Sequence, residues 1–203
     1  MKSKKIWAIT LKFITVVLGL LFIDLFFCGL FSPLPYRSLD PFYGRVVDAE
    51  TKKPIAGAVV LAVYESNAYT LAGEVGKIVD GQETLTDDKG EFRIKRKRRW
   101  FVLRRGYPEA QLIIFKPGYG TFPDHKLSDA VDENDNYPPP NKFVLYELPK
   151  LTKFEERREN VRFMDRFNEI PYYQKKIYWN EVNNERKNVM LPLRTLDKKE
   201  LKK

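Results

Sequence analysis

The sequence predicts a mainly β protein, in which an antiparallel sandwich of about seven strands follows an N-terminal transmembrane helix and precedes a C-terminal helical extension. Three observations lead to this prediction. Residues 43–149 contain several short runs rich in β-branched and aromatic residues, separated by Gly, Pro and Asp. Residues 6–31 are mostly apolar and follow a cluster of lysines. Beyond residue 150 the apolar side chains return to a helical spacing.

The N-terminal run is long enough to cross a bilayer, since about 20 apolar residues suffice. Lys2, Lys4 and Lys5 precede it, and basic residues stay on the cytoplasmic side of a membrane. We therefore expect the bulk of the chain to be periplasmic or extracellular. Two alternatives stay open, namely a cleaved signal peptide and a lipoprotein acylated at Cys28. The bulky residues around the possible cleavage positions favour the uncleaved helix.

Asp24 is a charged residue in or beside this predicted span. At the middle of a membrane a carboxylate costs about 2.5–3.5 kcal/mol, and such residues often have a function. Asp24 is therefore a candidate intramembrane site. The alternative is a span that ends at Ile23 and leaves Asp24 at the outer interface.

The composition divides the chain into four regions. Residues 1–31 are the membrane anchor or signal sequence, and residues 32–42, with three prolines, are an extended spacer. Residues 43–149 are the sandwich, and residues 150–203 are C-terminal helices with a charged tail. The net charge of +9 is concentrated in the anchor and in residues 95–105, so the remainder is close to neutral. This distribution does not suit a nucleic-acid partner.

The β region is predicted from apolar runs that end at turn residues. The segment 48–54 separates two such runs, and its proline and the following Gly57 are typical of a connection between strands. A turn at residues 88–90 joins another two strands and places Phe92 and Ile94 on one face. The predicted strands lie within residues 43–47, 58–65, 82–94, 110–116 and 141–149.

Three ordered motifs occur in this region. The first reads Gly-x-Val-x-Asp, a charged link and Pro-Ile-x-Gly-Ala; the second reads Thr-Asp-x-x-Gly-x-Phe; the third is a strand that runs into Gly-Tyr. Their residues are Gly44, Val46, Asp48, Thr51, Pro54, Ile55, Gly57 and Ala58, then Thr86, Asp87, Gly90 and Phe92, and finally Gly118 and Tyr119. This pattern resembles the carboxypeptidase regulatory-like domain, a transthyretin-like, Ig-like sandwich of seven strands. The resemblance covers roughly residues 43–149, and the links 66–81 and 95–107 are longer than is usual in that family.

The resemblance implies an accessory or binding module. The catalytic carboxypeptidase domain that often accompanies this family needs a zinc site of two His and a Glu, whereas this chain has one His, His125, and one Cys. These counts exclude multi-His and Cys-rich metal sites and an intrachain disulfide. We therefore expect a non-catalytic, membrane-tethered module for binding or scaffolding in the cell envelope, with no cofactor. The alternative is an envelope hydrolase that uses His125 with a distant Ser or Asp.

The segment 95–105 has the composition of an interaction site. Its seven cations flank four apolar residues, as in a segment that lies on an anionic lipid surface with its apolar side chains in the interface. The alternative is an extended hairpin whose apolar centre packs on its own domain while its cations are solvated. Expected partners are the membrane and an anionic lipid surface, an envelope protein or a glycan. The candidate residues are Lys95, Arg96, Lys97, Arg98, Arg99, Trp100, Phe101, Arg104 and Arg105.

Residues 132–136 read Asp-Glu-Asn-Asp-Asn and carry the oxygen ligands that calcium prefers. A calcium loop of the EF-hand type would need Gly and Glu where the chain has Tyr137 and Phe143. We therefore expect an acidic loop that holds no metal.

A helix is predicted over residues 151–170, because Thr152 and Glu155 have the spacing of a capping box. Pro171 ends this helix or begins a second one. The apolar side chains of the first helix are expected to pack on the sandwich or on the second helix. They are Phe154, Val161, Met164 and Phe167.

Overall fold

Eight strands, three α-helices and a short 3-10 helix form the described part of the computed structural model, so the mainly β class is confirmed. The described residues are 2–23, 36–70, 73–100, 106, 108–125, 138–162, 164 and 170–195. The strands are β1 (Tyr36–Leu39), β2 (Phe42–Asp48), β3 (Val59–Thr70), β4 (Gly73–Leu85), β5 (Glu91–Ile94), β6 (Lys97–Trp100), β7 (Glu109–Phe115) and β8 (Phe143–Leu148). The helices are α1 (Lys2–Ile23), α2 (Phe154–Arg162), η2 (Tyr172–Gln174) and α3 (Lys176–Asn188).

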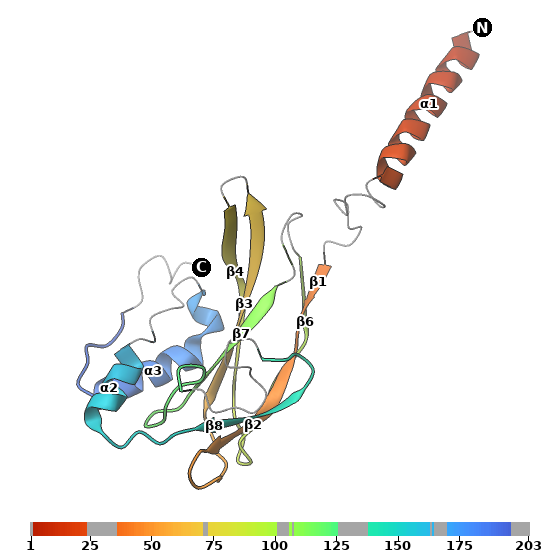
Figure 1. The fold of residues 1–203 in the computed structure, drawn as a ribbon. Helices are drawn as coiled ribbons and strands as arrows, with labels where there is room; N and C mark the ends of the chain where they lie inside the picture. Colours follow the sequence, from red (N-terminus) through yellow and green to blue (C-terminus); the bar gives the residue numbers. More distant parts are fainter. Residues whose placement is uncertain are drawn as a thin grey trace.

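Two three-stranded sheets, in the orders β5-β2-β8 and β4-β3-β7, pack face to face (Figure 1). Their facing side chains form one core, in which Val46 and Tyr146 of the first sheet meet Val60, Leu112 and Ile114 of the second. A third, two-stranded sheet pairs β1 with β6. Every run predicted as a strand contributes to these sheets. Alternating apolar residues and turn residues mark the strands locally, and burial of the apolar side chains then stabilises them.

One pairing differs from the antiparallel prediction. β2 and β8 run parallel, with Gly44 opposite Val144. A Cβ atom on Gly44 would lie 2.2 Å from the carbonyl oxygen of Val144, so the close approach of these strands requires glycine. The prediction was wrong here because the direction of a pairing between strands far apart in sequence leaves no mark on the local pattern.

Part of the predicted spacer is a strand. Residues 36–39 form β1, which pairs with β6, and the side chain of Leu39 is fully buried in the core. Pro41 lies between β1 and β2, where a missing backbone donor does not interrupt a ladder. Residues 36–39 of the expected spacer are thus part of a sheet, whereas residues 32–35 lie outside the described residues.

β3 is buried on both faces. Its alternate residues Val60, Ala62 and Tyr64 enter the core between the sheets, and Val59, Leu61 and Val63 form a second core with the C-terminal helices. This explains why the run is apolar at both parities. From α2, Val161 enters the second core, which also includes Met164, as expected from the helical spacing. Phe154 is instead exposed, and Phe167 lies outside the described residues.

α1 occupies most of the predicted membrane anchor. In the described part of the chain, no helix combines the length and the apolarity that crossing a membrane requires. Residues 24–31, which complete the predicted anchor and include Asp24 and Cys28, lie outside the described residues.

A buried ion pair fastens α2 and α3 to the sandwich. Glu185 on α3 accepts hydrogen bonds from Nε and Nη2 of Arg157 on α2, both at 2.8 Å, and from the N–H of Gly118 after β7 at 3.2 Å. Burial raises the pKa of Glu185, but the hydrogen bonds from Arg157 and Asn188, the charge of Arg157 and the Gly118 N–H outweigh it. The pKa of Glu185 therefore lies below its ordinary value of 4.5.

We expect this pair to stabilise the fold at neutral pH and to lose its effect in acid. Because the pKa of Glu185 is lower in the folded chain, its contribution is complete above the unfolded pKa and disappears as pH falls through the folded pKa. Glu185→Gln should lower the free energy of unfolding by about 1–3 kcal/mol at pH 7 and by much less at pH 3. Urea denaturation at both pH values measures this, with the exposed Glu159→Gln as control. A loss that is equal at the two pH values would contradict the expectation.

Candidate functional site

The basic segment is a β-strand over part of its length. β6 pairs antiparallel with β1, so that Leu39 lies opposite Lys97 and Arg37 opposite Arg99 (Figure 1). Because side chains alternate along a strand, residues 97 and 99 share one face of β6, and residue 98 lies on the other. The two faces of the strand therefore have different surroundings.

The face with Lys97 and Arg99 is turned to a buried carboxylate. Asp80 on β4 has a fully buried side chain, with Oδ2 at 2.7 Å from Nζ of Lys97 and Oδ1 at 2.5 Å from Nη1 of Arg99. Gln174 on η2 also donates from Nε2 to Oδ1 of Asp80 at 2.7 Å. The Lys97 contact is an ion pair without hydrogen-bond geometry. Since an unpaired buried carboxylate is costly, Lys97 and Arg99 serve as its counter-charges.

Three other exposed cations of the segment do not pair with Asp80, namely Lys95, Arg96 and Arg98. Arg96 donates from Nη2 to Oδ1 of Asn141 at 3.3 Å, which is a contact with a neutral amide. Among the described residues, none of the three forms an ion pair. The charges of these side chains are therefore available to an anionic surface.

The structure does not place every predicted residue of this site. Trp100 is the last residue of β6, but its side chain lies outside the described part, together with Phe101, Arg104 and Arg105. Asp24 and the acidic loop 132–136 also fall outside it. In the described ranges, no group of three or more His, Cys, Asp or Glu side chains is placed to hold a metal.

The surroundings of His125 do not match a catalytic triad. Nδ1 of His125 accepts a hydrogen bond from the backbone N–H of Thr121 at 3.1 Å, so the neutral ring carries its proton on Nε2. A general base acting through Nε2 would need the opposite tautomer. The hydroxyl of Thr121 is bonded to Oδ1 of Asn160 at 2.9 Å and is not directed to the imidazole. The nearby hollow, lined also by Asp124, Glu156 and Glu159, is acidic.

The chain matches no known family model, no curated protein and no solved structure. The contacts and charges of the chain itself are therefore the basis for its function.

Asp80 is the residue that sequence reasoning missed. It lies within the segment 66–81, which was expected to be a link between strands but belongs to the long hairpin of β3 and β4. An acidic residue directly after the apolar pair Ile78 and Val79 was the one available signal. Without knowing where β6 lies, Asp80 could not be distinguished from an acidic residue in an ordinary turn.

Asp80→Asn should destabilise the fold, because an amide cannot balance the two cations. We expect a loss of about 1–3 kcal/mol in the free energy of unfolding. This is less than for a fully enclosed pair, since Lys97 and Arg99 can turn to water. Urea denaturation at pH 7 measures the loss, with Asp88→Asn in the exposed turn after β4 as the matched control. Equal stability of the two variants would show that the Asp80 cluster is not a structural element.

Proposed function

We propose that this chain is a non-catalytic β-sandwich module of the carboxypeptidase regulatory-like type, tethered to a membrane by its N-terminal run and exposed in the cell envelope. We further propose that the exposed cations in and just before β6 rest on the anionic surface of that membrane. The exposed cations Lys95, Arg96 and Arg98, left over from the Asp80 cluster, carry the proposal.

The amino-acid sequence supports the tether. Residues 6–23 contain one charged residue, Lys12, and the apolar run continues past Ile23 to residues 24–31, beyond the described helix. Twelve residues separate α1 from β1, which allows a reach of roughly 40 Å at full extension. β6 pairs with β1, the strand that follows this connection, so its cations lie beside the part of the domain that directly follows the tether.

The motif residues support the proposed fold type and a non-catalytic role, because each has a structural contact. Oγ1 of Thr86 accepts the N–H of Ala58 at 2.8 Å and donates to the carbonyl of Ile55 at 2.7 Å. Asp87 accepts two backbone N–H groups through Oδ1, and Gly90 has a φ of 74° that disfavours other residues. The hydroxyl of Thr86 and Oδ1 of Asp87 are thus engaged in turns and strand contacts, which supports a structural role for these motif residues.

A C-terminal reporter should lie outside the cytoplasm. Three lysines precede the apolar run, so we expect the full chain fused to alkaline phosphatase to be active in a bacterial host, and a fusion to green fluorescent protein to be dark. Replacing Lys2, Lys4 and Lys5 with Glu should weaken this orientation. A fluorescent, phosphatase-inactive pair of fusions would overturn both the tether and the envelope location.

The β6 segment should be protected by anionic lipid. We expect hydrogen exchange of residues 95–100 to slow when the full chain is moved from neutral to anionic nanodiscs, and to recover at high salt. Arg96→Gln with Arg98→Gln should weaken the contact about 30-fold, since each cation contributes about 1 kcal/mol at such a surface.

The matched control is Lys53→Gln with Lys89→Gln, which removes two exposed cations from turns that β6 does not contact. Its protection should equal that of the native chain. If the native segment exchanges equally fast on both lipids, the cations of β6 are merely solvated and the membrane contact is wrong.

A further inference from the structure

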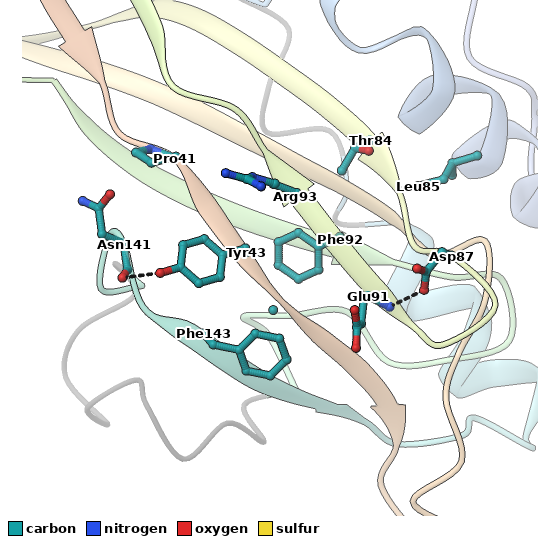
Figure 2. A pocket seen from close by; sticks show the side chains of 11 residues that line it. Pro41, Tyr43, Thr84, Leu85, Asp87, Glu91, Phe92, Arg93, Asn141 and Phe143 are labelled. Atoms are coloured by element: carbon teal, nitrogen blue, oxygen red, sulfur yellow. Dashed lines mark hydrogen bonds between the residues drawn. The ribbon is translucent and has the colours of Figure 1, made fainter.

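The outer face of the β5-β2-β8 sheet carries a groove of about 720 Å³ (Figure 2). β2 is the middle strand, so its outward side chains form the floor between those of β5 and β8. The last residues of β4, Thr84 and Leu85, and Asp87 in the turn that follows form one wall. The lining of the groove includes Gly44, Asp87 and Phe92 of the sequence motifs.

Three outward side chains form a row across the sheet. The strand register places Tyr43 opposite Arg93 on one side and opposite Phe143 on the other. The side chain of Phe143 is 59% exposed, so one face of its ring is open to a ligand. The rings of Tyr43 and Phe143 lie 6.5 Å apart, and the Tyr43 hydroxyl donates to the carbonyl oxygen of Asn141 at 2.5 Å, which fixes its orientation.

The groove is basic at the end near Asn141. Arg93 lines the groove and is exposed, and Arg96, just before β6, donates a hydrogen bond to Asn141. The other end carries the carboxylates of Asp87 and Glu91, where hydroxyl groups of a ligand can donate hydrogen bonds (Figure 2). Oδ1 of Asp87 already accepts the N–H groups of Lys89 and Glu91, so this oxygen serves its own turn. A fitting ligand therefore has an apolar ring face and a negative charge beside it.

We propose that this groove binds an acidic glycan. A sugar ring has an apolar face that lies on the exposed ring of Phe143, and a carboxylate on that sugar pairs with the guanidinium of Arg93. A peptide added to the sheet edge is a poorer fit, because β5 has four residues and offers a short ladder. The inference names the ligand of the proposed binding module and so rests on that function.

The test is calorimetric titration of the full chain in neutral nanodiscs with oligogalacturonate, and with a neutral malto-oligosaccharide of equal length. We expect oligogalacturonate to bind and the neutral sugar to bind at least tenfold more weakly. Phe143→Ala and Arg93→Gln should each weaken oligogalacturonate binding by roughly tenfold. Phe154→Ala and Arg158→Gln, which remove an exposed aromatic and an exposed cation from α2, should bind like the native chain. Thermal unfolding of each variant checks that the fold is retained.

Three outcomes would overturn the inference. They are no binding of either sugar, equal binding of both, or binding that survives Phe143→Ala and Arg93→Gln but is lost with Arg96→Gln and Arg98→Gln. The last result would assign the anion to the cations of β6. Reporter orientation and lipid protection do not involve Phe143 or Arg93, so failure of the glycan site and failure of the membrane-tethered module are told apart.

Discussion

The buried carboxylate of Asp80 holds together segments that are far apart in the chain. It forms ion pairs with Lys97 and Arg99 of β6 and accepts a hydrogen bond from Gln174 of η2. Oε1 of Gln174 in turn accepts the N–H of Gly81 at 3.0 Å. A carboxylate without water is stable only with such partners, so a four-residue strand with three basic residues is held against the sandwich by charge. The pairing also determines which cations of the basic segment remain exposed.

The C-terminal helices cover the outer face of the sheet that contains β3. Residues 59–64 of β3 are apolar on both faces, so the sheet that contains this strand needs a second cover, and α3 supplies Tyr178 and Val182. Glu83 on β4 accepts the N–H groups of Ile177 and Tyr178 at 2.8 and 2.9 Å, which satisfies donors at the start of α3. With the Arg157–Glu185 pair, this fixes the helices on the sheet. The described residues of α2 and α3 are therefore part of this packing and are not a separate appendage.

Much of this fold was predictable from local signals, and the remainder depends on partners that local sequence does not reveal. The turn of Asp87 and Gly90, and the alternation of Phe92 and Ile94, are set by neighbouring residues and were predicted correctly. β6 was not, since lysine and arginine are poor strand formers and the strand exists because β1 and Asp80 are present. The candidate site was predicted in the same uneven way. The sequence marked the cations, but it could not separate those paired with Asp80 from those left exposed, nor bring Arg93, Tyr43 and Phe143 into one row.

The two proposed surfaces meet at one residue. Asn141 has a positive φ of 60°, a conformation that asparagine adopts more readily than most residues. Its carbonyl oxygen holds the hydroxyl of Tyr43 in the groove, while its side chain accepts a hydrogen bond from Arg96 of the basic segment. Arg96 lies 3.3 Å from a residue that lines the groove, and charges act over a screening length of about 8 Å at physiological ionic strength. The charge of Arg96 therefore adds to the field at the basic end of the groove. An anionic bilayer and an acidic glycan would therefore draw on one shared positive field. Each would weaken the attraction of the other where both are present.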